Sequence, residues 1–221
     1  MKIVIKPSNY TSYSIIGYPR ITQRMHIPLK LTVCLIFTVF LFNSLVAAAS
    51  SKTFHHQMEI HLSPDTSEIR VSDQIQIPEH KRNAKEPIQL EFYLHAGLAI
   101  GNVHSATLAT DANEVALHSR PISIRHYTVT VPPGTETFTL QYGGRIHHEV
   151  KGPGQEYARS FGSTPGVIAP EGVFLASASA WYPQFSDALV SFQLDIQVPS
   201  GWDVMSQGTL LRENNGGETR H

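Results

Sequence analysis

Histidine is the residue type whose number and spacing first suggest chemistry. The chain has 221 residues and 12 histidines, and metal-ligating residue types stand in two groups: His55, His56 and His61, and His147, His148 and Glu149. Imidazole and carboxylate groups are common zinc ligands. Because successive side chains of a strand point to opposite faces, adjacent histidines cannot both bind one ion without a bulge. Histidines on the faces of a sheet are therefore the favoured interpretation, and a histidine metal site is the alternative.

Two short motifs approach known catalytic signatures without completing them. His148-Glu149 begins like the His-Glu-x-x-His motif of zinc proteases, but Gly152 stands where the second histidine must lie, one helical turn on. The nucleophile elbow of serine hydrolases needs a glycine two residues before the serine, and Phe161 occupies that place before Ser163. The sequence therefore predicts no catalytic residue, no metal ligand and no cofactor in this chain.

The most distinctive cluster of side chains is Trp181-Tyr182-Pro183. One interpretation is structural: the two aromatic rings fill the space between sheets, and the proline ends a strand. The other interpretation is functional, with these rings forming one wall of a cleft or an interface. The structural interpretation is the favoured one, because aromatic side chains dominate protein cores.

Alternation of apolar and polar residues positions these groups. It is clear at residues 58–62, 69–77, 88–94, 127–131, 138–142 and 190–198, and it is typical of half-buried strands. Pro- and Gly-rich breakers, including Gly143-Gly144, separate these runs and favour turns. The pattern predicts an all-β domain, an antiparallel sandwich or saddle-shaped sheet.

Two segments interrupt the alternation. Residues 151–171 contain many glycines and prolines, and they predict a long surface loop, of a kind that often serves a binding site or an interface. Residues 207–211 begin a strand and Asn214-Asn215-Gly216-Gly217 predicts a hairpin turn, but only four residues follow. We expect the return strand to be missing and the chain to be a piece of a longer protein.

The N-terminal region predicts export. Residues 31–49 are apolar and uncharged, follow Lys30, and end in small residues, as in a secretory signal helix cleaved between Ala49 and Ser50. Residues 1–49 are thus predicted to be an N-terminal extension with a signal peptide, with a second start at Met25, and residues 50–221 the β-sandwich domain. The alternative is an uncleaved membrane anchor formed by residues 31–49. The predicted location is periplasmic or secreted.

The charge of the mature chain disfavours nucleic acid as a partner. Five of the 17 basic residues precede Ser50, which leaves 12 against 18 acidic residues, a formal charge of −6. An acidic domain without a basic patch disfavours nucleic acid as a partner. The only cysteine, Cys34, precedes the predicted cleavage point, so the mature chain has neither disulfides nor thiolate zinc sites.

The order of five segments resembles a known family. These are residues 58–78, 90–98, 138–148, 172–185 and 192–208, from MEIHLSPDTSEIRVSDQIQIP to FQLDIQVPSGWDVMSQG. Together they are similar to the N-terminal domain of M1-family zinc aminopeptidases, specifically a divergent bacterial branch. The resemblance covers about residues 56–208. It depends on strand order, on the Trp181-Tyr182-Pro183 segment and on the Pro-x-Gly-Trp ending.

The resemblance implies a β-saddle domain that packs against a zinc-containing catalytic domain and helps to wall its peptide cleft. The family's His-Glu-x-x-His motif, its Gly-x-Met-Glu-Asn motif and its catalytic tyrosine have no counterpart in these 221 residues. Zinc is therefore expected only in a missing catalytic domain, on the same chain or in trans, and this chain is predicted to be inactive alone. The alternative is a stand-alone extracytoplasmic binding module that uses residues 151–171 and Trp181.

Overall fold

The computed structural model describes residues 1–7, 12–17, 53–109, 113–116, 122–148, 164–186, 188–215 and 218–220. Regular structure in these residues consists of strands and three short 3-10 helices, η1 (Pro64–Thr66), η2 (Glu79–Lys81) and η4 (Ser177–Ser179). The predicted all-β class is confirmed. No helix in the described ranges is long and apolar enough to cross a membrane.

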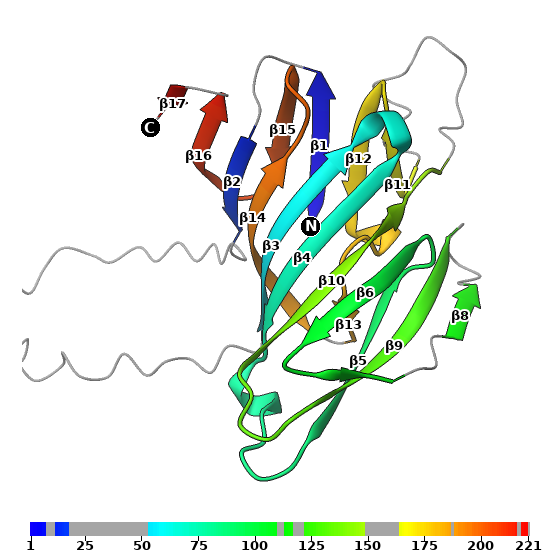
Figure 1. Cartoon of the computed structure of the whole chain (residues 1–221), viewed down its shortest axis with the longest axis vertical. Helices are drawn as coiled ribbons and strands as arrows, with labels where there is room; N and C mark the ends of the chain where they lie inside the picture. Colours follow the sequence, from blue (N-terminus) through cyan, green and yellow to red (C-terminus); the bar gives the residue numbers. More distant parts are fainter. Residues whose placement is uncertain are drawn as a thin grey trace, which may run out of the picture.

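The largest sheet has eight strands in the order β17-β16-β2-β14-β3-β4-β10-β6. Its long strands run diagonally through the molecule in Figure 1. All neighbours are antiparallel except β14 and β3, which are parallel, so the sheet is mixed. The strands are β2 (Ser12–Gly17), β3 (Thr53–Ser63), β4 (Glu68–Gln76), β6 (Leu98–His104), β10 (Thr137–Arg145), β14 (Leu189–Gln197), β16 (Thr209–Asn215) and β17 (Glu218–Arg220).

In Figure 1 the strands of one smaller sheet are drawn in the upper part of the molecule and those of the other in the lower part. The four-stranded sheet has the order β11-β12-β1-β15, and the five-stranded sheet has the order β13-β5-β9-β7 with β8 also paired to β9. The first contains β1 (Lys2–Pro7), β11 (Gly166–Ala169), β12 (Gly172–Ala176) and β15 (Trp202–Ser206). The second contains β5 (Ile88–His95), β7 (Thr107–Leu108), β8 (Asn113–Ala116), β9 (Ser123–Val131) and β13 (Gln184–Phe185).

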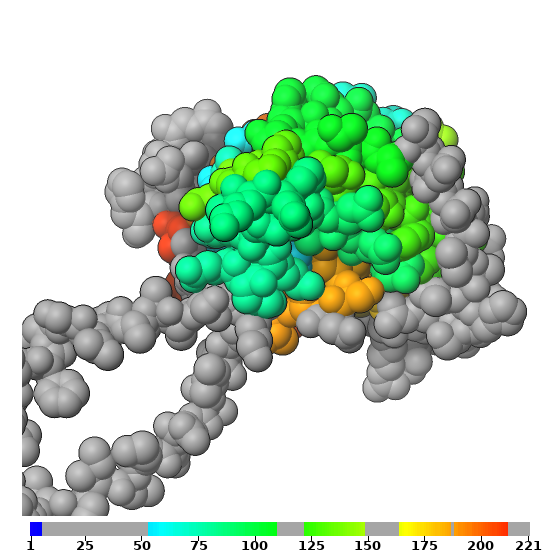
Figure 2. Space-filling model, turned by 90° about the horizontal axis from the view of Figure 1, so that it is seen from below, coloured from blue at the N-terminus to red at the C-terminus, as the bar shows by residue number. Residues whose placement is uncertain are grey.

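The three sheets share one hydrophobic core. Ile3 of β1, Ile60 of β3 and Phe92 of β5 are all fully buried in it. Phe185 stacks on Phe54 at a ring-centroid distance of 3.9 Å and lies 5.6 Å from Phe92, which joins the eight- and five-stranded sheets. Viewed from below in Figure 2, teal and green residues around η2 and β5 cover this end of the core, beside an orange strip of the chain between β12 and β14.

Alternating burial explains why the predicted strands form. In β3 and β4 every second residue is buried, which is the pattern of strands with one face on a core and one in solvent. The two strands are joined through η1, where Pro64 begins the turn and Ser67 ends it with φ of 58°. A positive φ is uncommon at a non-glycine residue, and it is found here in the left-handed region that often ends a helical turn.

Four expectations from the sequence need correction. The sheet is mixed rather than purely antiparallel, because β14 pairs with β3 across a long sequence separation. Gly143-Gly144 lies inside β10 and not in a turn. Residues 166–169 of the predicted loop form β11, which is buried on both faces and so shows no alternation. The return strand of the C-terminal hairpin is present, since β17 pairs antiparallel with β16.

Part of the predicted N-terminal extension belongs to the fold. β1 pairs with β12 and β15, and β2 pairs with β14 and β16. The predicted signal segment 31–49, the cleavage point between Ala49 and Ser50 and the second start at Met25 lie outside the described residues. The division of the chain at residue 49 and the export of the domain stay predictions.

Candidate functional site

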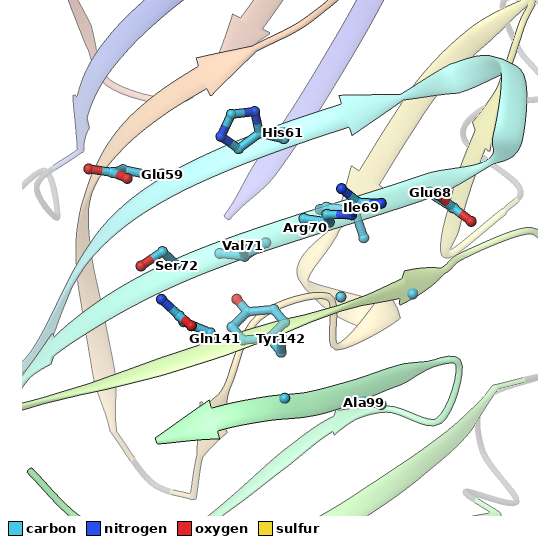
Figure 3. Close-up of a pocket in the computed structure, with 13 residues that line it drawn as sticks. Glu59, His61, Glu68, Ile69, Arg70, Val71, Ser72, Ala99, Gln141 and Tyr142 are labelled. Carbon is cyan, nitrogen blue, oxygen red and sulfur yellow. The ribbon is translucent and has the colours of Figure 1, made fainter. Parts of the chain in front are cut away.

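One face of the eight-stranded sheet is hollowed where β3, β4, β10 and β6 run side by side. This sheet-face hollow has a volume of about 520 Å³. Figure 3 shows its polar side chains on β3, β4 and β10, with Ala99 on β6. The lining residues are Glu59, His61, Glu68, Ile69, Arg70, Val71, Ser72, Ala99, Gly101, Gln141, Tyr142, Gly143 and Gly144.

Strand register explains why the sheet is hollow at this point. His61 lies opposite Arg70, Arg70 lies opposite Gly143, and Gly143 lies opposite Ala99. Along this row of opposed residues, the long side chains of His61 and Arg70 are followed by Gly143, which has no side chain, and by Ala99, which has only a methyl group. A Cβ at Gly143 would lie 2.7 Å from the carbonyl oxygen of Ile69, so a larger residue requires the strands to shift.

The hollow is lined by two carboxylates, those of Glu59 and Glu68, and by one guanidinium, that of Arg70. Glu68 and Arg145 form an ion pair at 3.6 Å, whereas Arg70 has no ion pair within the described ranges. A guanidinium offers a planar, two-pronged donor for a carboxylate. Ser72 and Gln141, opposite each other on β4 and β10, can hydrogen-bond the backbone of a bound peptide. The hollow is thus suited to binding a short polar or peptide-like ligand.

A second polar cluster lies inside the core beneath this face. His56 Nδ1 lies 2.8 Å from Asp73 Oδ2, and both side chains are fully buried. His56 Nε2 and Asp73 Oδ1 have no hydrogen-bond partner among the described residues. Because a buried unpaired polar atom costs stability, substitutions in this pair should have large effects.

Two tyrosines complete the internal cluster. Tyr142 is buried, and its pKa is raised well above its usual value by burial, with nearby Asp73 and Tyr182 adding to the rise. Burial also raises the pKa of Tyr182. The rings of His56 and Tyr182 meet edge to face, with centroids 5.8 Å apart. Both phenols therefore stay neutral at physiological pH, and this cluster is a structural part of the core.

A pair of histidines joins β5 to the segment before β11. His95 Nε2 lies 2.8 Å from His148 Nε2, and the rings meet edge to face. The Gly97 N–H donates to His95 Nδ1 at 2.9 Å, so the neutral His95 ring carries its proton on Nε2 and donates it to His148. Burial, His148 and Arg125 together lower the pKa of His95 to about 4.

The contacts of these histidines can be compared with the two groups that the sequence suggested as metal ligands. His55 and His56 point to opposite faces, His55 toward Ser191 at 2.9 Å and His56 toward Asp73. His148 contacts His95, and Glu149 lies outside the described residues. Within the described ranges, no three metal-ligating side chains come together. The pKa of His55 is lowered by burial and by His56, against an opposing effect of Asp73.

Trp181, Tyr182 and Pro183 all lie inside the molecule. Trp181 is fully buried, Tyr182 is almost so, and the two rings meet edge to face at 5.2 Å. This placement agrees with the structural interpretation of the cluster. A role of these residues at a cleft or at an interface with another domain stays a prediction. Because both rings are buried, another domain would have to contact the surface residues around them.

The sheet-face hollow was not found from the sequence. Gly143-Gly144 suggested a turn, and this hid the strip of small residues that opens the hollow. The signal that could have revealed it is the alternation of Phe138, Leu140 and Tyr142, which continues directly into the two glycines.

Comparison with known proteins gives a distant structural likeness. No family model and no curated protein matches this chain. Among solved structures, the chain is similar to an M1 zinc metallopeptidase from Deinococcus radiodurans bound to a Tyr-Ser-Ala substrate, with 10% sequence identity and a TM-score of 0.35. The match covers 72% of this chain and 38% of that one, so this chain spans well under half of that protein. At so low a TM-score, the likeness says nothing about the activity of this chain.

Proposed function

We propose that this chain is the non-catalytic N-terminal domain of an exported M1-like zinc metallopeptidase, an aminopeptidase. In this proposal the domain packs against a catalytic domain, on the same chain or in trans, and helps to wall the peptide cleft. Zinc and the catalytic residues belong to that other domain. The chain is exported, periplasmic or secreted, and touches a membrane only if residues 31–49 stay uncleaved.

The observation that carries the proposal is the order of the five family-like segments. Each of them forms strands around one shared core: β3 with β4, then β5, then β10, then β12 with β13, and finally β14 with β15. Strand order is a property of the whole domain. It therefore bears on the fold of the domain as a whole, and the function is carried over by analogy with the family.

Exposed apolar side chains near the end of the described chain support a partner domain. Met205, Leu210 and Leu211 are 54%, 50% and 51% exposed. Met205 lies on β15 of the four-stranded sheet, and Leu210 and Leu211 are neighbours on β16 of the eight-stranded sheet. Exposed large apolar side chains are one feature of contact sites. In the proposed parent protein, this part of β15 and β16 packs against the catalytic domain.

The sheet-face hollow supports the part of the proposal that concerns peptides. Arg70 has no ion pair among the described residues, so its guanidinium can pair with a ligand carboxylate, and Gly143 lines the hollow without a side chain. The guanidinium can hold the carboxyl end or an acidic side chain of a short peptide. Peptide contact by this face does not require any catalytic group in the chain.

The test of the proposal is hydrolysis by the purified full chain. We expect no release of arylamine from alanyl or leucyl arylamides, with or without added zinc, because no zinc-binding motif stands in the sequence. A matched assay with a known zinc aminopeptidase serves as the positive control. Hydrolysis by this chain that a chelator abolishes would refute its non-catalytic role.

The open hollow also favours a second candidate, a stand-alone extracytoplasmic binding module. Trialanine is a suitable probe, because its carboxylate can pair with Arg70. A module should unfold cooperatively on its own and bind the probe, with binding lost in Arg70→Ala and kept in Arg82→Ala, whose guanidinium already pairs with Glu136 at 3.1 Å. An orphaned half of an interface should instead self-associate through its apolar surface.

A further inference from the structure

β1 occupies an internal position in the four-stranded sheet. Ile3 lies opposite Leu175 of β12 on one side and opposite Ser206 of β15 on the other, antiparallel to both. Without β1 the sheet would divide, and β12 and β15 would face each other across a gap one strand wide. Both edges of that gap would present unpaired backbone donors and acceptors.

The side chains of β1 match the gap on both faces. Ile3 and Ile5 are 0% and 1% exposed and belong to the main core. Val4 points the other way and packs against a small cluster that includes Phe174, whose ring has the Lys2 ammonium 4.9 Å from its centroid. The Ser206 hydroxyl also donates to the Lys2 carbonyl at 3.0 Å. An occupant must therefore be extended, with branched apolar residues two apart.

The position of β1 in the chain makes it separable from its partners. β1 and β2 both precede residue 18, whereas β12, β14, β15 and β16, with which they pair, all follow residue 171. Residues 18–52, which link the two sets, lie outside the described residues. A cut within this link in the folded chain would turn residues 1–17 into part of a separate peptide, held only by strand pairing and by the burial of Ile3 and Ile5.

We propose that the gap between β12 and β15 is a strand-binding site, with residues 2–7 of the same chain as its occupant. The ligand class is an extended peptide with β-branched apolar residues at alternate positions, bound by adding its backbone to the sheet. Cleavage of the chain before residue 51 leaves this peptide bound and exchangeable. The site does not depend on the proposed relation to metallopeptidases.

The experiment uses the full chain with a protease site inserted between Ser50 and Ser51. After cutting, we expect the 1–50 fragment to stay with the domain through native size-exclusion chromatography. In a chain carrying Ile5→Asp the fragment should leave, because a carboxylate would be buried without a partner. Lys2→Gln is the matched control, since it removes only the contact of an exposed ammonium with the Phe174 ring and buries no charge, and its fragment should be retained.

Synthetic peptides of residues 1–17 provide the second measurement and do not require the Ile5→Asp chain to fold. Labelled wild-type and Lys2→Gln peptides should replace the fragment in the cut wild-type protein, and the Ile5→Asp peptide should bind at least ~100-fold more weakly. Release of the wild-type fragment on cutting would overturn the proposal. Equal binding of the three peptides would overturn it as well.

Discussion

The buried His56–Asp73 pair is the residue-scale feature with the largest expected effect on stability. Asp73→Ala leaves the imidazole buried without its partner, and we expect the free energy of unfolding to fall by about 3–5 kcal/mol. His55→Ala is the matched control next to it. Because His55 is only part-buried and bonds Ser191, its loss should cost about 1 kcal/mol.

Urea unfolding followed by circular dichroism measures the free energy of unfolding of Asp73→Ala and of His55→Ala. Replacing His56 and Asp73 together by leucine should cost less than Asp73→Ala alone, because neither group is then left unpaired. Equal costs for Asp73→Ala and His55→Ala would contradict a tightly coupled buried pair.

The His95–His148 pair predicts how stability depends on pH. The folded state holds the pKa of His95 near 4, below the usual value of 6.5, and burial and His147 lower the pKa of His148 as well. The unfolded chain therefore binds more protons between these values. Stability from this pair is complete above pH 6.5 and is lost as the pH falls toward 4.

His95→Leu should flatten the loss of stability between pH 6.5 and 4. Gly101→Ala gives the control, because it removes no titratable group and should leave the pH dependence as it is. The measurement is the urea midpoint at several pH values in that range. An unchanged slope in His95→Leu would show that other groups cause the acid sensitivity.

At the scale of elements, the pairing of β10 with β6 depends on one glycine. Gly144 has φ of +150°, and a Cβ there would lie 2.1 Å from the carbonyl oxygen of Gly97. We expect Gly144→Ala to lower the free energy of unfolding by at least ~2 kcal/mol. Gly101→Ala on β6 is the control, since its nearest contact would be 3.8 Å away, and it should change stability by about 0.5 kcal/mol or less.

The sequence predicted those strands that have one face in solvent. The apolar residues of the alternating pattern are largely the buried residues in β3, β4, β5, β9, β10 and β14. It failed for β11, whose four residues are all buried, because burial on both faces removes the period of two. Alternation also failed to predict β1. Its short apolar run Ile3-Val4-Ile5 forms a strand by pairing with β12 and β15, which lie far along the chain.

The candidate site was less predictable than the fold. The sequence excluded catalytic motifs and gave Trp181 a structural interpretation that its burial agrees with. The sheet-face hollow could not be predicted from the sequence, because the hollow depends on the strand register that places Gly143 between Arg70 and Ala99. Register between strands is set by long-range packing and not by local sequence.

At the scale of the whole molecule, exposed apolar residues predict self-association. Leu210→Ser with Leu211→Ser should reduce aggregation of the isolated chain and leave its melting temperature nearly unchanged, because both side chains are half exposed. Light scattering measures the first effect, and thermal unfolding the second. Leu194→Ala in the core is the contrast, with an expected loss of about 2–5 kcal/mol. Unchanged aggregation in the double variant would place the contact surface elsewhere.

The most direct test of the domain's proposed identity is the coding DNA downstream of His221, translated in all three frames. We predict a His-Glu-x-x-His motif followed by a distant glutamate, which would place this domain in front of a zinc peptidase domain. A stop codon followed by an unrelated gene would contradict a catalytic domain encoded next to this one, and would favour the stand-alone binding module.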